Sequence, residues 1–182
     1  IGAMTDWFTL NVQVTVALIG GAIVAFGWFV NAWRDRADQR RARIERVRDV
    51  QTALAAEILP YLEALELFDL NQHLINMVER IWGDEDYVPV VPTERNDTVF
   101  RAILPNIHLL PEPVIRPVVR YYSQLFAIEA IIEDLRSEVF KTMGPERREA
   151  MYADYISLKL QAIALGKSAV SAIDVELGRR DD

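Results

Sequence analysis

The chain changes character at Arg34. Residues 7–33 read WFTLNVQVTVALIGGAIVAFGWFVNAW, and residues 34–48 read RDRADQRRARIERVR. The first stretch holds 27 residues without a charge. As a helix it would extend about 40 Å, which exceeds the roughly 30 Å hydrocarbon core of a bilayer. Aromatic residues lie near both of its ends, where their rings favour the headgroup region. The pattern therefore predicts one transmembrane helix over residues 7–33.

Charged residues flank this segment unequally. Asp6 is the one charged residue before it, whereas seven arginines follow it at once. Because cytoplasmic flanks are enriched in Lys and Arg, we expect the N-terminus outside and residues 34–182 in the cytoplasm. The same arginines can contact anionic headgroups, so the lipid bilayer is the first expected partner. These topology residues are Arg34, Arg36, Arg40, Arg41, Arg43, Arg46 and Arg48.

Residues 1–6 form a short external N-terminus in this interpretation. Ile1, Gly2 and Ala3 precede Met4 and are typical of residues that remain after a tag is cleaved, so we expect the native chain to begin at Met4. The chain is rich in arginine and poor in lysine, which is typical of bacterial genomes of high GC content. The expected location is therefore a bacterial inner membrane.

One face of the apolar segment carries small residues. Ala17, Gly21 and Ala25 recur every four positions, which lets the backbone of a neighbouring helix approach closely. Small residues are also common in membrane helices in general, so the same spacing arises by chance as well. The functional interpretation predicts that copies of the chain associate in the membrane as a homo-oligomer.

The chain after the arginine cluster is acidic. From residue 50 onward it has 13 basic and 22 acidic residues. Binding to nucleic acid phosphates needs a concentrated basic face, so nucleic acid is not an expected partner. The chain also has no cysteine, which excludes disulfides, thiol nucleophiles and cysteine-based metal sites.

Apolar periodicity predicts that the membrane helix continues into a long amphipathic helix. The expected seam, with the spacing of a coiled coil, is formed by Ile44, Val47, Leu54, Ile58, Tyr61, Leu65 and Phe68. A kink is expected near Pro60 and the end of the helix at Trp82 and Gly83. Residues 83–98 contain two prolines and many acidic residues without a helical period, so they are predicted to form a solvated surface loop.

Two further long helices are expected. A short helix over residues 98–104 and a proline-rich turn precede a long helix over residues 112–141. Pro145 opens the final helix, which is expected to reach about Leu177, and Gly166 within it allows close packing. The seams are Val118, Tyr121, Leu125, Ile128, Ile132, Leu135 and Val139, then Tyr152, Tyr155, Ile156, Ile163, Ala169, Val170 and Ile173. The chain is therefore predicted to be all-α, with one transmembrane helix and a cytoplasmic up-and-down helical bundle of three long helices plus one short helix.

Few residues point to chemistry. His73 and His108 are candidates for metal binding or proton transfer, and Asp69 lies one turn before His73. Glu129 and Glu133 form a carboxylate pair at one-turn spacing. The sequence has no Glu-x-x-His pair, no glycine-rich phosphate loop and no Gly-x-Ser-x-Gly elbow. No catalytic, cofactor-binding or metal-binding residue is therefore assigned, and neither a cofactor nor enzymatic activity is expected.

These observations favour a membrane-anchored interaction or assembly protein that self-associates or binds a cytoplasmic protein partner. Two alternatives stay open. Several copies could surround a polar path containing Asn11, Gln13 and Thr15, as subunits of a small oligomeric channel or pore. The histidines and glutamates could instead belong to a metal-binding or enzymatic helical bundle.

Overall fold

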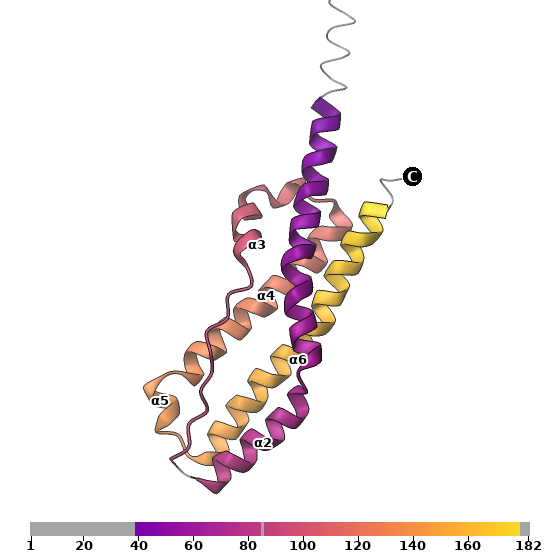
Figure 1. The fold of residues 1–182 in the computed structure, drawn as a ribbon. Helices are drawn as coiled ribbons and strands as arrows, with labels where there is room; N and C mark the ends of the chain where they lie inside the picture. The colour runs from indigo at the N-terminus through magenta and orange to yellow at the C-terminus, as the bar shows by residue number, and fades with distance from the viewer. Residues whose placement is uncertain (1–38, 85, 179–182) are drawn as a thin grey trace, which may run out of the picture. The chain divides into compact units, whose positions relative to one another are not determined.

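The computed structural model describes residues 39–84 and 86–178, and none of these residues forms a strand (Figure 1). The all-α prediction is therefore confirmed for this part of the chain. The chain divides into two units, residues 1–46 and residues 47–182, and the contacts below belong to the second unit. Several predictions lie outside the described residues, namely the membrane helix over residues 7–33, Ala17, Gly21, Ala25, Arg34 and Arg36.

Four longer helices and three short ones make up the described chain. The longer ones are a helix over residues 39–67 (helix 39–67), α2 (Leu70–Gly83), α4 (Glu112–Leu135) and α6 (Pro145–Gly178). The short ones are α3 (Thr98–Ile103), the 3-10 helix η1 (Leu104–Leu109) and α5 (Glu138–Lys141). In Figure 1 the yellow helix α6 runs beside α2, and α4 and α6 pack against each other along their length. The prediction of three long helices plus one short one is therefore wrong in number, because two of the expected helices are interrupted.

Helix 39–67 buries one face in the second unit. The buried positions are three or four residues apart, which is the spacing of one face of an amphipathic helix. They are Val47, Gln51, Leu54, Ile58, Leu62 and Leu65, and Ala55 beside Leu54 is also buried. The predicted seam is wrong at Ile44, which is 53% exposed, and at Phe68, which is 50% exposed because the helix ends one residue before it.

The first interruption lies at residues 68–69, not near Pro60. The Asp69 carboxylate accepts a hydrogen bond from Gln72 N at 2.9 Å and thereby caps the start of α2. Pro60 stays inside its helix, although it offers no N–H to the carbonyl of Ala56. Ala56 is exposed, so water can satisfy that carbonyl. The helix is therefore interrupted where Asp69 caps α2, and not at Pro60.

The second interruption divides the helix predicted over residues 112–141. α4 ends at Leu135, and Ser137 then caps α5 because its Oγ accepts a hydrogen bond from Phe140 N at 3.2 Å. The break changes the helical register. Phe140 is consequently buried, whereas the predicted seam residue Val139 is 63% exposed.

α6 approaches its neighbours closely at Gly166. A Cβ at this position would lie 2.6 Å from Leu62 Cδ2 and 3.0 Å from Tyr121 Cε2, so the prediction of close packing is confirmed. Among the described helices, α6 is also long and apolar enough to cross a membrane. It packs along α4 and α2, however, and buries Arg148 and Lys159. We therefore assign α6 to the bundle.

The connection between α2 and α3 is not helical, as predicted for residues 83–98, but it is only partly solvated. It runs along the bundle in Figure 1, and Val91 and Asp97 within it are 5% and 8% exposed. Val88 also packs against the core. This extended segment buries apolar side chains without helical periodicity, which is why the sequence pattern indicated a loop.

Candidate functional site

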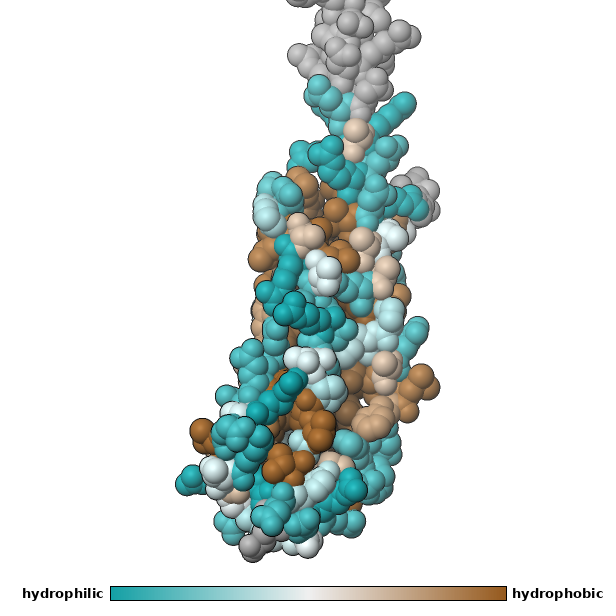
Figure 2. Space-filling model, turned by 60° about the vertical axis from the view of Figure 1, so that its left-hand side comes forward, coloured by the Kyte–Doolittle hydropathy of each residue, from teal (hydrophilic) through white to brown (hydrophobic). Residues whose placement is uncertain are grey.

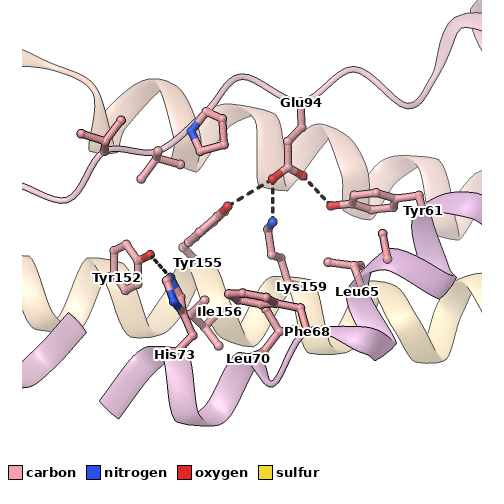
Figure 3. A pocket seen from close by; sticks show the side chains of 14 residues that line it. Tyr61, Leu65, Phe68, Leu70, His73, Glu94, Tyr152, Tyr155, Ile156 and Lys159 are labelled. Carbon is pink, nitrogen blue, oxygen red and sulfur yellow. Dashed lines mark hydrogen bonds and ion pairs between the residues drawn. The ribbon is translucent and has the colours of Figure 1, made fainter. Parts of the chain in front are cut away.

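A pocket of about 420 Å³ lies where this connection crosses α6 and the turn between helix 39–67 and α2 (Figure 3). Its apolar walls include Leu65, Phe68, Leu70, Val90, Val91 and Ile156. Its polar groups belong to Tyr61, His73, Glu94, Tyr152, Tyr155 and Lys159. Pockets of this size with mostly apolar walls and a few convergent polar groups are typical of small-molecule sites.

Glu94 is the central polar residue of the pocket. Its Oε1 lies 2.5 Å from Lys159 Nζ and accepts a hydrogen bond from Tyr155 Oη at 3.3 Å. Its Oε2 accepts a hydrogen bond from Tyr61 Oη at 2.6 Å. Figure 3 shows the three side chains converging on this carboxylate from two helices. The Lys159 and Glu94 side chains are only 11% and 18% exposed, so the ion pair is largely desolvated and depends on these extra hydrogen bonds.

His73 and Tyr152 form a second polar pair in the pocket. His73 Nε2 lies 2.9 Å from Tyr152 Oη, and the imidazole and the Phe68 ring form a T-shaped contact with a centroid distance of 4.9 Å. Burial lowers the pKa of His73 below 6.5, and the positive charge of Lys159 lowers this pKa further. The imidazole is therefore neutral at pH 7. Asp69, expected to pair with it, caps α2 instead.

Two arginines hold the connection, one before the pocket residues and one among them. Arg148 Nη1 donates a hydrogen bond to the Tyr87 carbonyl at 2.5 Å, before the pocket residues. Arg136 Nη1 donates a hydrogen bond to Thr93 Oγ1 at 3.0 Å, between the pocket residues Pro92 and Glu94. Between these points Val90 is 94% exposed at the rim of the pocket. Charge-assisted contacts thus hold the connection at Tyr87 and at Thr93, and Val90 between them is open to solvent.

A separate polar cluster forms around Glu57 on helix 39–67. Its carboxylate accepts hydrogen bonds from Val99 N at 2.6 Å, from Phe100 N at 3.1 Å and from Tyr122 Oη at 2.7 Å. The first two donors are amides of the first turn of α3, which Asp97 does not cap with its side chain. Glu57 therefore caps α3 from another helix. Phe100 then stacks on Tyr122, with ring centroids 3.9 Å apart.

The structure does not bring the other predicted site residues together. His108 is exposed in η1, and Glu133 is exposed on α4. Glu129 accepts a hydrogen bond from Arg101 Nη2 at 3.2 Å. Within residues 39–84 and 86–178, no three His, Asp or Glu side chains are grouped for a metal ion.

The topology arginines that lie in the described part are all exposed, namely Arg40, Arg41, Arg43, Arg46 and Arg48. The seam tyrosines Tyr121, Tyr152 and Tyr155 are buried as predicted, and Tyr122 beside Tyr121 is buried as well.

The sequence interpretation missed Glu57, Glu94 and Lys159. A signal existed for Lys159, because it lies between Ile156 and Ala162 on the apolar face of the last helix. A charged residue on a buried face needs a partner. No comparable signal existed for Glu57 and Glu94, whose partners lie between 33 and 65 residues away in the sequence.

No protein-family model matches this sequence, and comparisons with curated proteins and with solved structures find no significant match.

Proposed function

We propose that this chain is a membrane-anchored interaction protein that associates with further copies of itself. In this proposal residues 7–33 cross the bilayer, and the helical bundle lies on the cytoplasmic side. The 27 uncharged residues and the arginine cluster that follows them support the anchor and its orientation. The arginine-rich composition favours a bacterial inner membrane as its location. The proposal includes no catalytic role and no cofactor.

The observation that carries the proposal is a second apolar face on α2. Leu70 and Ile81 are buried on the face toward the bundle, as the fold requires. Ile75 and Trp82 lie two turns apart on another face and are 51% and 53% exposed, with the partly buried Val78 between them. Apolar residues at positions i, i+3 and i+7 are the pattern by which one helix packs on another.

The Ile75 and Trp82 side chains remain accessible at the surface of the bundle. Figure 2 shows apolar side chains at the surface of the bundle in patches between hydrophilic ones. The indole N–H of Trp82 donates a hydrogen bond to Glu149 Oε2 at 2.6 Å, which restrains the ring at the surface. A restrained aromatic ring loses little conformational entropy on binding, which favours its use as a contact residue.

A second copy of the chain fits this face best. Ala17, Gly21 and Ala25 predict contact between membrane helices, and contact in the membrane would raise the effective concentration of the attached bundles. A small apolar surface such as the α2 face would then be enough for a second contact. The two interfaces would support each other without either being strong alone.

Light scattering on the full chain in detergent tests this proposal. The wild-type protein is expected to have the mass of two or more chains, and Gly21→Leu and Ile75→Glu are each expected to lower it. Val175→Glu is the matched control, since Val175 is also 51% exposed but lies on α6. A wild-type monomer would refute self-association. An unchanged mass for Ile75→Glu would show that α2 is not the interface.

A further inference from the structure

We infer that the pocket around Lys159 binds a neutral, mainly apolar small molecule that carries one carbonyl-type hydrogen-bond acceptor. This inference goes beyond self-association and is independent of it, because the pocket and the outer face of α2 use different residues. The argument rests on the volume of the pocket, on its exposed apolar rim and on the unused donors of Lys159.

The pocket has the size and the walls of a ligand site. Its volume of about 420 Å³ is open to solvent, and aliphatic and aromatic side chains form most of its lining (Figure 3). Phe68 and Val90 at its rim are 50% and 94% exposed. Covering these two side chains with an apolar molecule removes their surface from water, which is the main driving force for such binding.

Lys159 supplies the polar contact. An ammonium group has three N–H donors. The structure gives Lys159 Nζ one hydrogen-bond acceptor, Glu94 Oε1, and places it 4.9 Å from the centroid of the Tyr155 ring. The Lys159 side chain is only 11% exposed, so water has limited access to the remaining donors. A ligand oxygen that accepts from one of them would satisfy a desolvated charge, and such bonds are stronger than neutral ones.

The ligand is neutral because the pocket already balances its charges. Glu94 neutralises Lys159 at 2.5 Å, and His73 is kept neutral by burial and by Lys159. A ligand carboxylate would place a second negative charge beside Glu94. A ligand cation would place a second positive charge beside Lys159. A ketone, an ester or an amide carbonyl accepts the hydrogen bond without this cost.

Benzophenone is a suitable probe, and diphenylmethane is its analogue without the carbonyl oxygen. The full chain is placed in lipid nanodiscs and irradiated with benzophenone, which forms covalent adducts with nearby C–H groups. Peptide mass spectrometry then locates the adducts. We expect saturable labelling of the peptides that contain Phe68 or Ile156. Labelling that stays linear with benzophenone concentration, or that lies elsewhere, would overturn the proposal.

Competition measures the contribution of the carbonyl group. Perdeuterated benzophenone, at about the same concentration as the unlabelled probe, is expected to halve the amount of adduct formed by the unlabelled probe. Diphenylmethane should need a roughly 10-fold higher concentration for the same effect, because it lacks one hydrogen bond to a charged donor. In Glu94→Gln combined with Lys159→Met, which removes both charges together, the two competitors are expected to become equal. Equal competition in the wild-type protein would refute the acceptor contact.

A pair of alanine substitutions tests the location. Ala64 lines the pocket from an exposed position, so Ala64→Trp should fill the pocket with little effect on folding. Ala56 is exposed two turns earlier on the same helix and outside the pocket, so Ala56→Trp is the matched control. We expect Ala64→Trp to lower the saturable labelling about 10-fold, as for a blocked site. Equal labelling of the two variants would refute the assignment.

Discussion

Replacing Glu57 by alanine should destabilise the bundle more than the change of one partly exposed side chain suggests. The carboxylate accepts three hydrogen bonds, two from first-turn amides of α3 and one from Tyr122 Oη. Without it, two amides and a buried hydroxyl lose their acceptor, and each such loss costs about 1–3 kcal/mol. Allowing for partial access of water to the amides, we expect a total loss of about 3–5 kcal/mol.

Thermal unfolding of the full chain in detergent, followed by circular dichroism, measures this effect. A loss of this size should lower Tm by roughly 10 °C in a chain of this length. Glu57→Gln keeps an acceptor oxygen without the charge and should lose only about 1–2 kcal/mol. Glu63→Ala changes an exposed glutamate on the same helix and serves as the control.

The position of the damage distinguishes a cap from a general packing defect. In Glu57→Ala the amides of Val99 and Phe100 should exchange with solvent deuterium faster, while amides in the middle of α4 keep their protection. The reasoning is refuted if Tm of Glu57→Ala stays within about 1 °C of that of Glu63→Ala, since an exposed substitution has little effect.

Three further outcomes follow from contacts described above. Gly166→Ala should destabilise the bundle by about 1–2 kcal/mol in denaturant titrations, because overpacking exceeds the gain in helix propensity, whereas Gly144→Ala has open space around it and should not. The pKa of His73, read from its ring signals by NMR, should lie below 6.5, and a result at or above 6.5 would contradict the burial argument. Because the folded state resists protonation of this ring, stability should fall as the pH drops below about 6.5, and His73→Gln should remove that part of the decline. Arg148→Met frees the carbonyl at the start of the connection and should speed proteolysis there, while Arg147→Met, at an exposed position, should leave the rate unchanged.

The sequence predicted the features that depend on local periodicity. The seam of α4 from Val118 to Leu135, the start of α6 at Pro145 and the close approach at Gly166 all agree with the structure. Each follows from spacing along one helix or from a single residue with a known steric effect. The predicted end of the helix that begins at residue 112 was wrong because Ser137 caps a new helix there. The apolar spacing continues past Ser137 and does not reveal this cap.

The candidate site was less predictable for a physical reason. Glu94 belongs to an extended segment that packs through isolated contacts, so no period marks it as part of the core. In the sequence Glu57 has the pattern of a surface glutamate on an amphipathic helix. Its role depends on the amides of α3, which contact it only in the folded structure. Only Lys159, a charge within an apolar helical face, carried a signal that sequence reasoning can detect.

The contacts of Glu94 also have a kinetic consequence. Its three partners are 33, 61 and 65 positions away in the sequence and belong to two helices. All three contacts can therefore be present only once helix 39–67 and α6 have met. The segment that carries Glu94 should therefore be among the last parts of the bundle to become ordered. By the same logic it should open before the helices do, as a separate cooperative unit in native-state hydrogen exchange. The wall of the pocket would then be the part of the domain that exchanges between open and closed forms at the lowest free energy.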